Sequence, residues 1–169
     1  MPLVRYRMVH AQGCACSSNK HMWQEAETST HQDHVIKHVI GATVLGWVVA
    51  GEAAHFLLDI GFLWTVYLDG EMNLLPQGVA LAEFEVDETQ AFDRSELVFD
   101  ADQLLSNGRQ ATGLKCFVGA PGDCLIENVE MLTLDSRRRI AIRGELATIN
   151  VDLNPDTAEV QVLFQDTSS

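Results

Sequence analysis

Three histidines in the segment THQDHVIKH, residues 30–38, have a spacing that could hold a metal ion. On a helix, His31, His34 and His38 would share one face, where imidazole nitrogens can converge on zinc or iron. On a strand, residues four apart are separated by about 13 Å and cannot share an ion, so such a site requires helical backbone through His38. The start of the segment resembles a helix capping box, but the β-branched residues after it favour a strand. We therefore expect these histidines to be surface residues rather than metal ligands.

A second group with possible chemistry, His55 and Asp59, lies inside the apolar run AHFLLDIGFLW. An ionised carboxylate in apolar surroundings is unfavourable unless it is paired, and a displaced pKa would suit acid–base catalysis with His55 as the partner. The alternative is structural, because an aspartate at the bend before Gly61 can accept hydrogen bonds from backbone N–H groups. We favour the structural alternative and keep the two residues as candidate catalytic groups.

A second possible metal set lies near the N-terminus and consists of His10, Cys14, Cys16 and His21. The single residue between its two cysteines is fewer than the two to four that zinc sites usually have. Motifs for phosphate, dinucleotide or acyl-enzyme chemistry are missing from the sequence. We therefore predict no cofactor.

The remaining two cysteines, Cys116 and Cys124, flank the loop FVGAPGD. If that loop closes a hairpin, the two thiols stand opposite each other and could form a disulfide or a redox pair. Buried reduced thiols are the third alternative and the one we expect in a reducing cytoplasm.

The elements that must position these residues are mainly strands. From residue 35 onward, runs of β-branched and aromatic residues are interrupted every 8 to 12 residues by turn residues, which is typical of an antiparallel fold. We predict a mainly β fold, with a single antiparallel sheet arranged as a meander or partly closed barrel and with one or two short helices. In the front half, the expected strands are residues 43–49, 53–68, 71–75 and 79–86, with a hairpin turn at Asp69 and Gly70.

The segment AAHFLLDIGFLWTVYL, residues 53–68, is apolar on every side, so periodicity cannot separate a buried helix from a buried strand. Its β-branched and aromatic residues favour a strand. If the sheet closes into a barrel, Trp47, Trp64 and Tyr67 are the candidate lining of a ligand cavity.

The C-terminal half carries clearer signals. A proline turn over residues 154–157 separates two alternating strands, and the parity of the apolar positions changes near Gly144, where a bulge or sharp bend is needed. One helix is expected over residues 100–107, ended by Gly108. Residues 1–30 lack apolar periodicity, so we predict a mobile N-terminal tail there and a single β-rich domain over residues 31–166.

Charge restricts the class of partner. Asp and Glu total 24 against 11 Lys and Arg, giving a formal net charge of −13, and no Lys or Arg lies between His38 and Asp93. Such a field repels phosphate backbones and anionic lipid surfaces, so we expect neither nucleic acid nor a membrane as partner. The chain also lacks a membrane-spanning apolar run and the apolar core of a signal peptide, which predicts a soluble cytoplasmic protein.

Three functions remain open on the sequence. We expect a non-catalytic binding or assembly domain that associates with itself or with a protein partner, because catalytic motifs are missing and β edges commonly become interfaces. The alternatives are a small-molecule-binding β-barrel and a metal-dependent enzyme that uses His31, His34 and His38.

Overall fold

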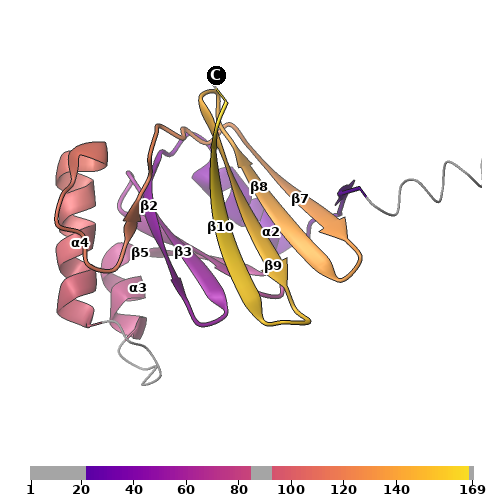
Figure 1. The fold of residues 1–169 in the computed structure, drawn as a ribbon, viewed down its shortest axis with the longest axis horizontal. Helices are drawn as coiled ribbons and strands as arrows, with labels where there is room; N and C mark the ends of the chain where they lie inside the picture. Colours follow the sequence, from indigo (N-terminus) through magenta and orange to yellow (C-terminus); the bar gives the residue numbers. More distant parts are fainter. Residues whose placement is uncertain (1–21, 85–92, 168–169) are drawn as a thin grey trace, which may run out of the picture.

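A computed structural model describes residues 22–84 and 93–167 of the protein. Its elements form three layers, with an outer sheet, a central sheet and a layer made by helices α3 and α4 (Figure 1). In chain order they are β1 (Gln24–Glu25), α2 (Thr30–Val39), β2 (Val44–Ala50), β3 (Ala53–Leu58), β4 (Phe62–Tyr67), β5 (Met72–Pro76), α3 (Gln77–Glu83), α4 (Arg94–Asn107), the 3-10 turn η2 (Gly108–Gln110), β6 (Val118–Gly119), β7 (Asn128–Leu134), β8 (Arg137–Arg143), β9 (Ala147–Asn154) and β10 (Glu159–Asp166). The prediction of a mainly β protein is confirmed.

The central sheet, ordered β5-β4-β3-β2-β6, is buried on both faces. Successive residues of a strand point to opposite faces, so Trp47, Phe56 and Trp64 face the outer sheet. Their chain neighbours Val48, Leu57 and Leu63 face α3 and α4. This double burial explains why residues 53–68 are apolar on every side, and it confirms the choice of strand there. The segment forms two strands, β3 and β4, because Gly61 at φ 81° turns the chain between them.

The outer sheet, ordered β1-β7-β8-β9-β10, has one buried face and one polar face. Its apolar side chains pack against the central sheet, and α2 adds Val35 and Val39 to the same core. On β8 and β9 the polar face carries Arg139, which donates two hydrogen bonds of 2.6 and 2.8 Å to the Asp152 carboxylate. The Trp23 ring lies 4.4 Å from the Arg139 guanidinium. The predicted bend at Gly144 is the loop between β8 and β9, where an added Cβ would lie 2.6 Å from the Leu125 carbonyl oxygen.

The prediction of one sheet is wrong, whereas the expected meander is present, because β2 to β5 and β7 to β10 each pair in chain order as antiparallel neighbours. The strands of the described residues form two separate sheets of five, because the chain passes through α3 and α4 after β5 instead of pairing its next strand with β5. Periodicity reports which face of a strand is buried and does not report which strand it pairs with. The number of helices also differs from the prediction, because the described residues contain three α-helices, α2, α3 and α4, rather than one or two.

The expected strand over residues 79–86 is also wrong, since α3 continues through Glu83 and residues 85–86 lie outside the described residues. Alternation at Ala80 and Ala82 suited a strand, but alanine, leucine and glutamate are strong helix formers, and Ala80 and Leu81 are buried together as adjacent residues. The expected helix over residues 100–107 is confirmed, with Gly108 at φ 55° after its last turn. It begins earlier, at Arg94, because the Asp93 side chain caps it.

The segment after Thr30 is helical, so the expectation of a strand there is wrong. Ser29 caps α2 in a capping box with Gln32, one residue before the box that the sequence suggested. The tail predicted over residues 1–30 falls mostly on residues 1–21, which lie outside the described residues, and its mobility stays a prediction. Gln24 and Glu25 pair with Thr133 and Leu132 of β7. None of the helices in the described segments is long and apolar enough to cross a bilayer.

A buried carboxylate joins α4 to the chain that leads into β6. Asp100 is fully buried, and its oxygens accept hydrogen bonds from the backbone N–H groups of Lys115 at 2.9 and 3.0 Å, Cys116 at 2.6 Å and Phe117 at 2.8 Å. Carboxylates accept such bonds more strongly than neutral oxygens do. This contact cannot be recognised in the sequence, because nothing there distinguishes Asp100 from the other acidic residues of the same helix.

We predict that Asp100→Asn lowers the free energy of unfolding by about 2 to 4 kcal/mol, because an amide presents one acceptor oxygen to three N–H groups and directs its own donors at them. Urea denaturation measures the loss. Asp102→Asn, at an exposed position of the same helix, is the matched control and should stay within about 0.5 kcal/mol of the parent. Equal losses in the two variants would contradict the role given to Asp100.

Candidate functional site

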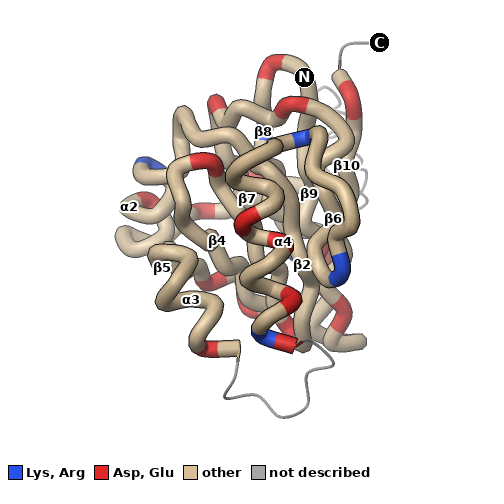
Figure 2. The backbone as a smooth tube through the Cα atoms, turned by 90° about the vertical axis from the view of Figure 1, so that its left-hand side faces the viewer, with Lys and Arg blue, Asp and Glu red and all other residues tan. Residues whose placement is uncertain are grey.

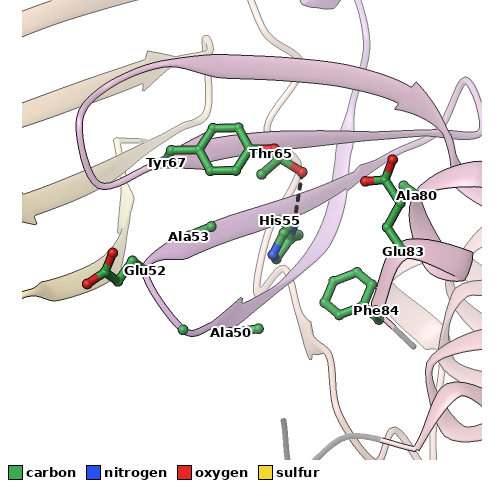
Figure 3. A pocket seen from close by; sticks show the side chains of 10 residues that line it. Ala50, Glu52, Ala53, His55, Thr65, Tyr67, Ala80, Glu83 and Phe84 are labelled. Atoms are coloured by element: carbon green, nitrogen blue, oxygen red, sulfur yellow. Dashed lines mark hydrogen bonds between the residues drawn. The ribbon is translucent and has the colours of Figure 1, made fainter. Parts of the chain in front are cut away.

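A pocket of about 290 Å³ opens at the end of the central sheet that lies next to α3 (Figure 3). The strand register places Ala53 opposite Tyr67 and His55 opposite Thr65, so these four side chains share the face that looks toward the helix layer. The rest of the lining comes from the turn between β2 and β3 and from α3, and comprises Ala50, Gly51, Glu52, Ala80, Glu83 and Phe84. Small side chains at Ala50, Ala53 and Ala80 leave the space open.

His55 is the central polar group of the pocket. Its Nδ1 lies 2.8 Å from the Thr65 hydroxyl oxygen, and its ring lies 4.7 Å from the Phe84 ring in an edge-on arrangement. Burial lowers the His55 pKa to about 4, so the imidazole is neutral at physiological pH. The Thr65 hydroxyl can donate to Nδ1 or accept from it, and Nε2 then carries either a proton or a lone pair. Figure 3 shows the ring reaching from β3 into the space between Thr65 and Phe84.

The structure does not bring His55 and Asp59 together. Asp59 is exposed beyond the end of β3, and its Oδ1 accepts a hydrogen bond of 2.9 Å from the Thr43 backbone N–H. That is the kind of contact expected for a structural aspartate at the bend. Because the two residues are four apart on an extended chain, about 13 Å of backbone separates them. An acid–base pair made of these two side chains has no geometric support.

The three aromatic candidates for ligand binding are divided between the two faces of the central sheet. Trp47 and Trp64 are buried in the core between the sheets, where each packs against Phe56 at ring distances of 6.3 and 5.8 Å. Side chains fill this region, so the two tryptophans are part of the core. Only Tyr67 reaches the pocket, because its position on β4 differs in parity from that of Trp64.

The three histidines of α2 are exposed and have other contacts. His31 Nε2 donates to the Met72 carbonyl oxygen at 3.0 Å, and His38 Nδ1 donates to the His34 carbonyl oxygen at 2.8 Å. The His34 and His38 rings lie 4.5 Å apart. Although the backbone through His38 is helical, the described residues contain no group of three or more His, Cys, Asp or Glu side chains placed to hold a metal ion. The other metal candidates, His10, Cys14, Cys16 and His21, lie outside the described residues.

Cys116 and Cys124 do not face each other across a hairpin. Cys116 packs against the core on the helix side of the central sheet, while Cys124 is buried in the core between the sheets. Both are free thiols, and burial raises the pKa of Cys124 to about 11. For Cys116, burial and then the Asp100 carboxylate raise the pKa of the thiol. The side chains of both cysteines therefore contribute to core packing.

Sequence reasoning found His55 and Tyr67 but missed Thr65, Glu83 and Phe84. Thr65 could have been found, because a turn at the Asp-Ile-Gly segment places residues 55 and 65 opposite each other. Treating residues 53–68 as one strand concealed that pairing. The expected strand over residues 79–86 places Glu83 and Phe84 on opposite faces of a sheet. In the structure they lie at the end of α3 and both line the pocket.

Comparisons with known protein families, with characterised proteins and with solved structures found no match for this chain.

We predict that His55 makes stability fall as the pH is lowered. The folded-state pKa of about 4 lies below the ordinary value of 6.5. Below pH 6.5 His55 therefore becomes protonated in the unfolded chain, whereas in the folded protein it stays neutral until about pH 4, and this difference favours unfolding. Between about pH 7.5 and pH 5 this linkage should remove about 2 kcal/mol, measured by urea denaturation at each pH. His55→Gln should lose that part of the pH dependence, and an unchanged profile in this variant would refute the assignment.

Proposed function

We propose that the protein is a non-catalytic binding protein and that the pocket around His55 holds a small-molecule ligand. The observation that carries the proposal is a neutral, partly buried imidazole at the centre of an open pocket. Ligand sites commonly combine apolar walls with a few placed polar groups. In this pocket Phe84 and three alanines form the apolar wall, and the polar groups are His55, Thr65 and the carboxylates of Glu52 and Glu83.

Binding is favoured over catalysis by the protonation behaviour of His55. A general base works best when its pKa is near the working pH, and a pKa of about 4 makes the imidazole a weak base at neutral pH. A hydroxyl rather than a carboxylate is its partner, so the ring is not activated in the way that a catalytic histidine usually is. The pocket volume of about 290 Å³ suits a fragment-sized molecule, near the lower limit of about 300 Å³ for ligand pockets.

A fragment screen by two-dimensional amide NMR tests this proposal. We predict that binding fragments shift the amide signals of β3, β4 and α3, and that Ala53→Leu, which extends a side chain into the pocket, abolishes the shifts. Thr112→Leu, at an exposed loop position outside the pocket, is the control and should leave binding unchanged. Should Ala53→Leu fail to fold, His55→Gln replaces it. Fragments that bind without disturbing these elements, or a screen without hits, would contradict the proposal.

Self-association is a second proposed property, favoured by β10. This eight-residue strand pairs only with β9 among the described strands, and an unpaired strand edge can add a strand from another copy. We also propose that this edge can bind a protein partner and that the protein is cytoplasmic.

We predict a sedimentation-equilibrium mass of at least two chains, reduced to one chain by Leu163→Lys, because a charge on an edge strand opposes pairing. Leu146→Lys, at an exposed residue just before β9, is the control. A single-chain mass for the parent protein would contradict self-association.

A further inference from the structure

We propose that the pocket around His55 selects a small organic cation, a protonated amine on an apolar or aromatic body. This inference rests on the proposed binding function and adds the chemical class of the ligand. It follows from the charges, the aromatic rings and the neutral imidazole that line the pocket.

The charged side chains of the lining are both acidic. Glu52 comes from the turn between β2 and β3, Glu83 comes from the end of α3, and the described lining contains no Lys or Arg. Figure 3 shows the two carboxylates on opposite sides of the His55 ring. A cation between them gains attraction from both, whereas an anion is repelled by both. Arg138 lies outside the pocket and lines an adjoining hollow. Glu52 and Tyr67 line both the hollow and the pocket, and Asp69 also lines the hollow.

The surroundings of the pocket have the same sign. Asp and Glu positions predominate over Lys and Arg on the face formed by α3 and α4 (Figure 2), and the sequence has no Lys or Arg between His38 and Asp93. A field of one sign raises the local concentration of oppositely charged ligands and speeds their arrival. Phosphorylated or carboxylated molecules are disfavoured by the same field.

The polar and aromatic groups suit an ammonium ion. When His55 Nδ1 donates to the Thr65 hydroxyl, the Nε2 lone pair is available to an N–H donor, and a neutral imidazole adds no repulsive charge. The rings of Tyr67 and Phe84 offer the apolar and cation–π surface that organic cations prefer. A bare metal ion is a poorer occupant, because no group of three ligating side chains is placed to hold one among the described residues.

The test uses three probes with one aromatic body and different charge, namely phenethylamine, 2-phenylethanol and 3-phenylpropanoate, with titration calorimetry of the full-length chain. At about pH 7.5 these are a cation, a neutral molecule and an anion. We expect the amine to bind at least about tenfold more tightly than the alcohol, and the anion to bind more weakly than either. Raising the salt from about 50 mM to about 500 mM should weaken only the amine.

Variants separate charge from shape. Glu83→Gln and Glu52→Gln should each weaken the amine by roughly three- to tenfold and leave the alcohol unchanged, since exposed carboxylates contribute modestly. Glu159→Gln, at an exposed acid on β10, is the matched control. Binding of the alcohol as tightly as the amine would overturn the inference while leaving the proposed pocket function intact. Failure of all three probes overturns the inference too, and the fragment screen then decides the pocket function by itself.

Discussion

The central sheet is apolar on both of its faces, and each face must be covered. Strands β2, β3 and β4 place large apolar side chains on alternate sides, with Phe56 and Trp64 toward one layer and Leu57 and Leu63 toward the other. Neither set can face water without losing about 1.5 to 3 kcal/mol for each side chain. The outer sheet covers the first face and α3 with α4 covers the second (Figure 1). The three layers follow from this requirement.

The pocket is the place where the helix layer stops covering the central sheet completely. In the middle of that face, leucines from α3 and α4 fill the space, as Leu81, Leu97 and Leu104 do. Toward the turn between β2 and β3 the facing residues are alanines, and the sheet carries His55 and Thr65 in place of an aliphatic pair. A polar pair in a largely apolar layer needs its own hydrogen bond, which the two side chains supply to each other.

The parts of this fold that depend on local sequence could be predicted. The turn at Gly70, which has φ 88°, the end of α4 at Gly108 and the bend at Gly144 each follow from a backbone requirement that one residue type meets. The division into two sheets and the contact of Asp100 could not be predicted, because both join residues far apart in the chain. The helix at α3 was missed because apolar and acidic residues alternate from Ala82 through Phe84, as in a strand, although Ala80 and Leu81 are buried as neighbours in the structure. Of the site, His55 and Tyr67 were found, whereas Thr65 depended on locating the turn before Phe62 and Glu83 and Phe84 depended on recognising α3 as a helix.

The placement of the tryptophans has a spectroscopic consequence. Trp47 and Trp64 both lie between the two sheets, Trp23 lies against Arg139 on the outer sheet, and the chain has three tryptophans in all. The Trp64 indole N–H is buried and has no hydrogen-bond partner among the described residues, so its emission should occur at short wavelength, as from a dry apolar solvent. The helix side of the central sheet has no indole, and loosening of α3 and α4 would leave the emission almost unchanged. Intrinsic fluorescence therefore reports on one half of this molecule, and a probe of helicity is needed to follow the half that carries the pocket.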